Sequence, residues 1–173
     1  MEKRRRSNRE DNERERSEFD QKVVEVKRVT RVVAGGKRMR FRALVVIGDH
    51  KGKVGMGLKK GADFAESVNK ATNAAKKNMI TVPLVNDTIP HEINMKYKSS
   101  SLMLKPARPG TGVIAGGAVR QVFDLAGVRN VVSKMLGSNN KVNNIKAVFA
   151  AFRKMKSKEA LWQMRKERKE NSE

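Results

Sequence analysis

The sequence contains no cysteine, which excludes disulfide bonds, thiolate metal sites and cysteine nucleophiles. Histidine is almost absent too: His50 and His91 are the only two, neither has a neighbour at metal-ligand spacing, and both are expected to be surface or hydrogen-bonded residues. No apolar run approaches a length of about 20 residues, which a membrane-spanning helix needs, and the N-terminus lacks the apolar block of a signal peptide. These absences predict a soluble, cytoplasmic protein without a bound metal or a membrane span.

Aromatic residues are also scarce, at 5% of the 173 residues. Proteins that bind single-stranded nucleic acid stack bases on exposed rings, so this scarcity argues against that class. What the chain has instead is a formal net charge of +21. Residues 1–18 hold seven basic and six acidic side chains and residues 157–173 hold five and four, so the excess lies in residues 19–156. A folded core this basic predicts a polyanionic partner, either nucleic acid or an anionic membrane surface.

Composition and patterning divide the chain into four segments. Residues 1–18 are charged and almost free of apolar side chains, which predicts a disordered extension. Residues 19–82 and 85–156 are each expected to form a small domain, and the fold class is α+β. Residues 157–173 form a charged tail that can be helical, with Trp162 as its one anchor.

The first domain is predicted to be three antiparallel strands followed by a helix. A valine-rich run has a phase slip near Lys27–Arg28 that indicates a β-bulge, and Gly35-Gly36 marks a hairpin turn. The helix has apolar residues at intervals of three or four between Phe64 and Met79, and is expected to cover one face of the sheet. The strand after the turn alternates between an apolar face and an arginine face: Met39, Phe41, Ala43, Val45 and Ile47 against Arg38, Arg40 and Arg42.

The second domain is predicted to have the order β-β-α-β-α. Its strands are expected near residues 93–97, 101–105 and 130–136. One helix begins at about Ala115 and ends at Gly127, which stands where a helix C-cap belongs, and the other spans Val142–Met155.

Two glycine-rich segments invite comparison with nucleotide-binding loops. The Gly110-x-Gly112-x-x-Ala115 pattern lacks the acidic residue that a dinucleotide fingerprint places at the end of a second strand. A tight loop that lets a helix pack close to a strand is the favoured interpretation, and an enzyme that uses a nucleotide is the alternative. The Gly48–Gly57 segment leads into a strand, which excludes a P-loop because the phosphate must lie at a helix N-terminus.

Lysines stand between the glycines of the second segment. Small residues let the backbone approach a phosphate while lysines neutralise it, and the arginines of the preceding strand are expected to share the same face. A solvated lysine-rich turn is the alternative. We therefore predict backbone and shape recognition of double-helical RNA by Arg38, Arg40, Arg42, Lys51, Lys53, Lys59 and Lys60.

Six stretches between about Phe19 and Met155 form a joint pattern: Val29–Lys37, Phe41–Asp49, Gly52–Gly57, Lys76–Ile80, Gly110–Arg120 and Ala126–Val128. In this order they resemble ribosomal protein S-five of the bacterial small subunit. The charged ends of the chain differ from the usual pattern of that family.

The resemblance implies a first domain like a double-stranded-RNA-binding domain without its first helix. It implies a second α/β domain in which two helices cover one face of a four-stranded sheet. The implied function is that of a structural constituent of the small subunit, not an enzyme, with no cofactor and no small-molecule substrate. Its implied partners are 16S ribosomal RNA, ribosomal proteins S-four and S-eight, and messenger RNA where it enters the subunit, and its roles are in assembly, decoding accuracy and translation.

The resemblance also implies roles for individual residues. Arg31 and Lys37 join the RNA-binding set, and Arg28 and Lys37 line the path by which messenger RNA enters, where Lys37 replaces an arginine common in the family. The hairpin residues near the site of spectinomycin action are Thr30, Gly35, Gly36 and Lys37. The contact with S-four involves Gly110, Thr111, Gly112 and Arg120. The alternatives kept open are the nucleotide-using enzyme and a peripheral membrane or general nucleic-acid-compacting protein.

Overall fold

The computed structural model describes residues 19–156 and Trp162. The predictions of a disordered extension at residues 1–18 and of a charged tail at residues 157–173 lie outside the described residues, except for the exposed side chain of Trp162.

The N-terminal sheet is a four-stranded antiparallel meander that carries one helix. Its strands follow the order β1-β2-β3-β4, and the bounds are β1 (Asp20–Val33), β2 (Gly36–Gly48), β3 (Lys53–Gly61), α2 (Phe64–Lys77) and β4 (Met79–Thr81). The prediction of three strands and a helix is confirmed, and the structure adds the short β4, which pairs with the start of β3.

The C-terminal sheet is also four-stranded, with the order β5-β6-β8-β7. Its elements are β5 (Ile93–Tyr97), β6 (Ser100–Pro106), β7 (Val113–Ile114), α3 (Gly117–Ala126), β8 (Val131–Met135) and α4 (Lys141–Lys154). The predicted α+β fold with a helical pair on one face is confirmed. The helix predicted from about Ala115 begins at Gly117, and the structure adds the short strand β7 before it, which runs parallel to β8. Gly127 caps α3 with a φ of 79°, as expected.

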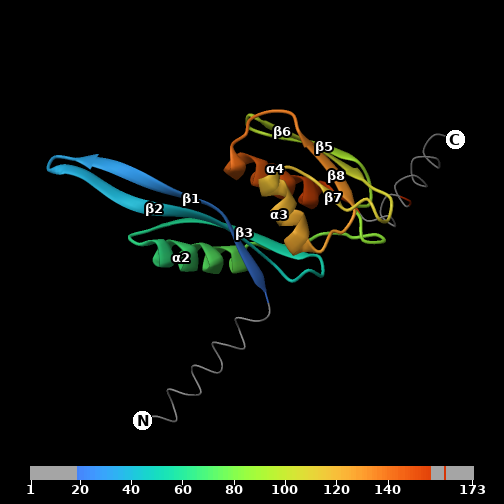
Figure 1. Ribbon diagram of the computed structural model, residues 1–173, viewed down its shortest axis with the longest axis horizontal. Helices are drawn as coiled ribbons and strands as arrows, with labels where there is room; N and C mark the ends of the chain where they lie inside the picture. Colours follow the sequence, from blue (N-terminus) through green and yellow to red (C-terminus); the bar gives the residue numbers. More distant parts are fainter. Residues whose placement is uncertain (1–18, 157–161, 163–173) are drawn as a thin grey trace, which may run out of the picture.

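The two domains stack as alternating layers (Figure 1). From bottom to top these are α2, the N-terminal sheet, the α3–α4 pair and the C-terminal sheet. On the α2 side of β2, Ala43, Val45 and Ile47 are buried against the helix, whereas Leu44 and Val46 belong to the large core shared with α3 and α4. Both faces of this part of the sheet are therefore covered, which explains the unbroken apolar run of β2.

A β-bulge lies in β1 at Val24, not near Lys27–Arg28 as predicted. The register shifts between the pairs Val23–Val45 and Glu25–Leu44, and the extra residue, Val24, is buried in the shared core. From Lys27 onward nearly every side chain of β1 is exposed, so the spacing of its valines carries no information on a buried face. The apparent phase slip had no structural cause there.

The domains are joined where the β2–β3 turn meets the end of α3. The backbone N–H of His50 donates to the Leu125 carbonyl at 3.0 Å, and that of Gly52 donates to the Ala126 carbonyl at 3.0 Å. The turn thus satisfies carbonyls that a helix C-terminus leaves without an intrahelical partner.

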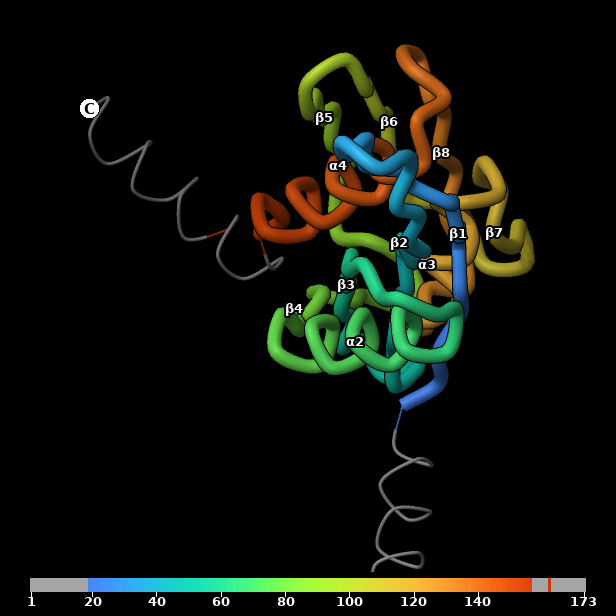
Figure 2. Tube along the Cα trace, turned by 90° about the vertical axis from the view of Figure 1, so that its left-hand side faces the viewer, coloured from blue at the N-terminus to red at the C-terminus, as the bar shows by residue number. Residues whose placement is uncertain are grey.

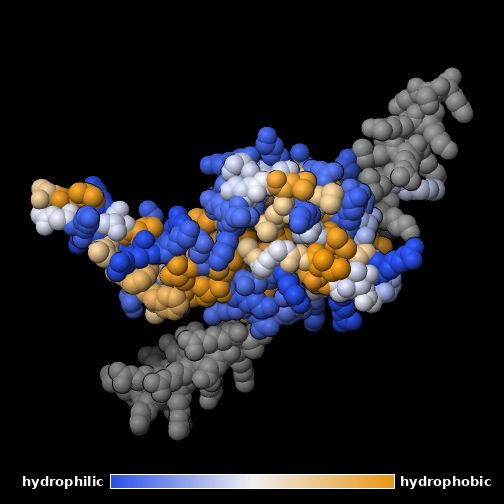
Figure 3. Space-filling model, turned by 45° about the horizontal axis from the view of Figure 1, so that its top comes forward, coloured by the Kyte–Doolittle hydropathy of each residue, from blue (hydrophilic) through white to orange (hydrophobic). Residues whose placement is uncertain are grey.

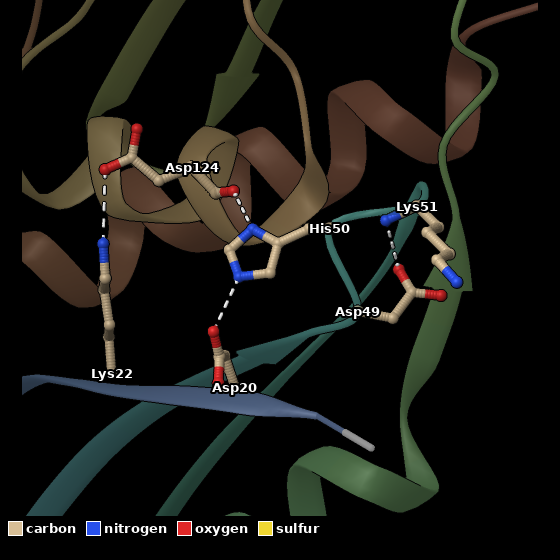
Figure 4. A network of polar contacts seen from close by, with 6 residues as sticks. All are labelled: Asp20, Lys22, Asp49, His50, Lys51 and Asp124. Carbon is tan, nitrogen blue, oxygen red and sulfur yellow. Dashed lines mark hydrogen bonds and ion pairs between the residues drawn. The ribbon is translucent and has the colours of Figure 1, made fainter. Parts of the chain in front are cut away.

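Side chains close around the same junction (Figure 4). The His50 ring contacts the Asp124 carbonyl through Nδ1 at 2.8 Å and the Asp20 carboxylate through Nε2 at 2.9 Å. Lys22 donates to the Asp124 carboxylate at 3.3 Å. The expectation that His50 is a hydrogen-bonded residue is confirmed, and the contacts tie β1 and β2 to the C-terminal domain.

Candidate nucleic-acid interface

The β1–β2 hairpin projects beyond α2 as a long two-stranded arm (Figure 1), which we define as residues 27–42. Every residue from Lys27 to Arg40 except Val29 is exposed. Figure 3 shows hydrophilic surface along the arm and apolar surface at its end. Val32 at that end is 75% exposed, so the arm has no core of its own and is shaped by cross-strand pairing alone.

The strand register gathers cations on one face of the arm. Arg31 pairs with Arg38, and Arg42 pairs with Lys27 on one side and Lys60 on the other. Paired residues of antiparallel strands share a face, and alternate residues along a strand share it too. The resulting set, which we call the arginine face, consists of Lys27, Arg31, Arg38, Arg40, Arg42 and Lys60.

Within the described residues, only Lys27 of the arginine face forms an ion pair, with Glu25 at 3.5 Å. The other five cations have no carboxylate partner among residues 19–156. A hollow of about 290 Å³ on the arm is lined by Arg31, Arg38 and Lys60, among others. Five uncompensated cations at cross-strand spacing repel one another unless an anion lies between them.

The remaining predicted lysines do not share this face. Lys59 pairs with Ala43 and therefore lies on the α2 side. Lys51 and Lys53 lie at the opposite end of β3, in the turn between the domains, where their backbone N–H groups donate to the Asp49 carboxylate at 2.8 and 2.9 Å. Figure 4 shows the first of these bonds. The prediction of one shared face is wrong for these three residues.

The glycines of this segment also have another role than the predicted approach to phosphate. A Cβ added at Gly57 would lie 1.9 Å from the Ala71 carbonyl oxygen, and one at Gly48 would lie 2.1 Å from the Leu125 carbonyl oxygen. These positions let α2 and α3 pack directly on the sheet. The missing side chains therefore serve helix packing.

Two lysines that sequence reasoning missed join Lys59 on the α2 side. Lys70 and Lys77 stand two helical turns apart on α2 and line a groove of about 330 Å³ with Lys59. Lys70 also donates to the Glu66 carboxylate, and this bond, with a further one from the Ala62 backbone N–H, holds the pKa of Glu66 below its usual value. The sequence signal that could have identified Lys70 and Lys77 is their seven-residue spacing, which puts them on one side of the helix.

The other face of the arm holds the remaining hairpin residues. Arg28 pairs with Phe41, Thr30 with Met39, and all lie opposite to the arginine face. Lys37 pairs with Val32 on the same side. At the turn, Gly36 has a φ of 133°, a conformation that favours glycine, and a Cβ at Gly35 would meet no atom within 4 Å.

The Gly110–Arg120 segment forms a loop, a short strand and the start of α3. The Gly112 N–H donates to the Asn130 side-chain oxygen at 3.2 Å, and its carbonyl accepts from the Val131 N–H at 3.1 Å. Because strand β7 separates Gly112 from the helix, the glycines do not form the strand-to-helix turn that a dinucleotide fingerprint requires. Ile114 is 53% exposed, and Thr111 and Arg120 of the same segment are exposed as well.

The described part of the chain offers neither a membrane span nor a metal-binding cluster. Among residues 19–156 and Trp162, no helix is long and apolar enough to cross a membrane. The same residues contain no group of three or more histidine or acidic side chains that could hold a metal ion.

A basic two-stranded arm on a helix-backed antiparallel sheet is typical of proteins that bind nucleic acid. Comparison with known families gives the particular class. Residues 19–83 match the model for the N-terminal domain of ribosomal protein S5, and residues 95–165 match the model for its C-terminal domain. A curated relative, small ribosomal subunit protein uS5 of Chloroflexus aurantiacus, is 49% identical over 140 residues, which are 81% of this chain and 79% of the relative.

The chain therefore belongs to the ribosomal protein S5 family, the S-five family that its motifs resemble. Ribosomal proteins of this family are structural components and not enzymes, so the prediction of a non-enzymatic protein is confirmed by the family.

Proposed function

We propose that this protein is a structural constituent of the small ribosomal subunit in the cytoplasm and that its arginine face binds the backbone of 16S ribosomal RNA. The observation that carries the proposal is the set of five cations without a carboxylate partner among residues 19–156. Family membership supports the ribosomal setting, since the relative from Chloroflexus aurantiacus is a small ribosomal subunit protein.

Double-helical RNA fits the arginine face better than single-stranded RNA or a membrane does. The one ring of the arm, Phe41, lies on the opposite face, so the arginine face offers no ring on which a base could stack. Val29 and Val33 are the only apolar side chains on the arm part of this face, and the rest, apart from Gly36, are cations. A membrane-binding surface would need more apolar side chains to insert. Arginines at cross-strand spacing suit a row of phosphates.

The test is the salt dependence of binding to a folded fragment of 16S ribosomal RNA. We expect the triple variant Arg38→Gln, Arg40→Gln and Arg42→Gln to lower the slope of log affinity against log salt by about one unit for each phosphate that is no longer neutralised. The matched control removes three exposed lysines from the C-terminal domain, Lys96→Gln, Lys98→Gln and Lys134→Gln. Equal slopes for the two triple variants would contradict an RNA contact by the arginine face.

Incorporation into the subunit is measured separately. Tagged full-length protein is expected to sediment with small subunits and to remain with them after a moderate salt wash. Protein found only in the soluble fraction would contradict the ribosomal assignment.

Finer roles belong to the same proposal. Arg28 and Lys37 are proposed to line the path by which messenger RNA enters the subunit, and their place on the exposed face opposite the arginine face leaves them free for a second strand. The arm's turn, with Thr30, Gly35 and Gly36, is proposed to lie near the site of spectinomycin action. Lys51, Lys53 and Lys59 remain proposed RNA contacts, but on surfaces other than the arginine face.

Two protein partners, S-four and S-eight, are also proposed. The surface for S-four is formed by Gly110, Thr111, Gly112 and Arg120, with the exposed Ile114 as its apolar contact. An exposed branched side chain beside a tight loop suits docking on another protein and has no use in binding a phosphate. Through this contact the protein is proposed to influence decoding accuracy.

A further inference from the structure

A crevice of about 320 Å³ lies between the two domains, away from the arm. In Figure 2, α4 lies between β5 and the β3–β4 edge of the N-terminal sheet. Met56 of β3, Asn78 at the end of α2 and Tyr97 at the end of β5 line it together with α4 residues Lys146, Phe149 and Arg153. Its volume is at the lower end of the range for ligand sites, which begins at about 300 Å³.

Part of the crevice offers apolar and aromatic surface. Tyr97 is the one tyrosine of a chain poor in rings, and its ring is half-buried, with the Lys146 ammonium 5.8 Å from the ring centroid. Phe149 is 4% exposed and Met56 is half-buried, so both show only a small part of their surface. A flat partner with an apolar face can lie against such a surface and gain by stacking.

The rest of the crevice is cationic and polar. Arg153 forms no ion pair with another described residue, and no carboxylate is among the lining residues. The Asn78 side-chain N–H group donates to the Ala74 carbonyl at 3.0 Å, whereas its side-chain oxygen has no partner among residues 19–156. A group that brings a negative charge and a hydrogen-bond donor would therefore satisfy both the cations and the amide.

We propose that the crevice holds one unpaired nucleotide of an RNA strand. Its base lies against the Tyr97 ring in place of the Lys146 ammonium, its edge reaches Asn78, and its phosphate lies at Arg153 and the displaced Lys146. The proposal rests on the proposed function, because RNA is the polyanion that surrounds this chain in a ribosomal subunit. An acidic peptide has the same charge but gains less, since no carboxylate side chain also offers a flat ring at a fixed distance from the charge.

The first experiment titrates the isotope-labelled full-length protein with adenosine 5′-monophosphate and with ribose 5-phosphate, followed by nuclear magnetic resonance. We expect the nucleotide to shift resonances of Tyr97 and Phe149 and to bind at least about fivefold more tightly than ribose 5-phosphate, because stacking adds to the phosphate contact. Tyr97→Leu should remove this preference. Equal affinities of the two compounds, or no saturable binding of either, would overturn the proposal.

A charge-matched pair of variants provides the second experiment. Arg153 lines the crevice and the neighbouring Lys154 does not, although both are exposed cations in the last turn of α4. Arg153→Gln should weaken nucleotide binding about three- to fivefold, as expected for an exposed charge contact, and Lys154→Gln should leave it nearly unchanged. The same reduction in both variants would show a diffuse charge effect and overturn the proposal.

Two controls distinguish a failure of the crevice proposal from a failure of the proposed function on which it rests. An acidic tripeptide, Asp-Phe-Asp, that bound the crevice more tightly than the nucleotide would assign it to a protein and overturn the nucleotide. Tyr97→Leu should keep the salt slope on folded 16S RNA that the arginine face determines. If the nucleotide does not bind but the arginine variants of the arm lower the salt slope as expected, only the crevice proposal is rejected. If the arginine variants leave the salt slope unchanged, the proposed function is rejected. If Tyr97→Leu does not fold by circular dichroism, the Arg153 and Lys154 pair decides.

Discussion

Alanine substitutions at four glycines can test the close backbone packing at the junction between the domains. Gly127 has a φ of 79°, and a Cβ there would lie 2.1 Å from the His50 carbonyl oxygen. Gly48 has an unstrained φ, but its Cβ would lie 2.1 Å from the Leu125 carbonyl oxygen. Both contacts are with backbone, which cannot rotate away as a side chain would.

The other two glycines separate backbone strain from steric overlap. Gly110 has a φ of 87° and open space around its Cβ position, so alanine there meets the strain alone. Gly117, the first residue of α3, has neither a positive φ nor an atom within 4 Å of its Cβ position. Alanine therefore meets backbone strain alone at Gly110, steric overlap alone at Gly48, both at Gly127 and neither at Gly117.

The expected changes follow from these two terms. Gly117→Ala should stabilise the protein by about 0.5 to 1 kcal/mol, because glycine is a poor helix residue. Gly110→Ala should cost about 1 kcal/mol, from a left-handed conformation that L-residues disfavour. Gly48→Ala should cost about 1 to 3 kcal/mol through overpacking. Gly127→Ala combines both terms and should cost about 2 to 5 kcal/mol, a large share of a typical domain's stability.

The assay is urea unfolding of the full-length protein, followed by far-ultraviolet circular dichroism. The order of midpoints should be Gly117→Ala, then wild type, Gly110→Ala, Gly48→Ala and Gly127→Ala. If Gly127→Ala were no less stable than Gly110→Ala, the backbone contact between the β2–β3 turn and α3 would be absent in solution, and the layered arrangement of the domains would be wrong.

Three further outcomes are expected. Because its Lys70 bond lowers the pKa of Glu66, the stability that the carboxylate adds is complete above about pH 4.3, the usual glutamate pKa, and is lost as the pH falls through the lowered value. The protection factors of the amides in the first turn of α2, which are corrected for the slower intrinsic exchange in acid, should therefore fall on acidification in the wild type and not in Glu66→Gln. Deleting Gly35 or Gly36 should leave the fold intact, as hairpin tips tolerate change, and alter spectinomycin sensitivity; wild-type sensitivity with confirmed incorporation would refute the arm's assigned place. Gly112→Arg should weaken association with S-four and change misreading while RNA binding persists, whereas Gly112→Ala, which adds strain without bulk or charge, should have a smaller effect.

The elements with clear periodicity could be predicted from the sequence, and the short ones could not. Alternation of arginines with apolar residues identified the first half of β2, and spacing of three or four residues identified α2 and α4, because each helix buries one regular face. Strand β4 has three residues and β7 has two, which is too short for any period to show. The bulge at Val24 puts this residue into a core cluster to which both domains contribute, and that cluster forms only in the tertiary structure.

The candidate site was predicted in part, for reasons visible in the strands. Alternation correctly placed Arg38, Arg40 and Arg42 on one face. The same rule puts the adjacent Lys59 and Lys60 on opposite faces, so their division could have been foreseen. The distance of Lys53 from the arm follows from the meander, in which the β2–β3 turn lies at the opposite end of β2 from the arm's turn. Which helix packs against each glycine could be learned only from the tertiary structure.

Strand β2 connects the three parts of the molecule on which the proposals depend. Its first residues form the arm, its middle is covered by α2 on one face and by the α3 side on the other, and its end enters the turn that caps α3. At ~3.3 Å per residue, 13 residues span roughly 40 Å. An arm without a core of its own takes its direction from the part of the strand that is fixed at both faces. A small rotation at the Gly48–His50 junction would therefore displace the arm's turn by several times the movement at the junction, so the packing of two backbones at one end of β2 determines where the cations at the other end lie.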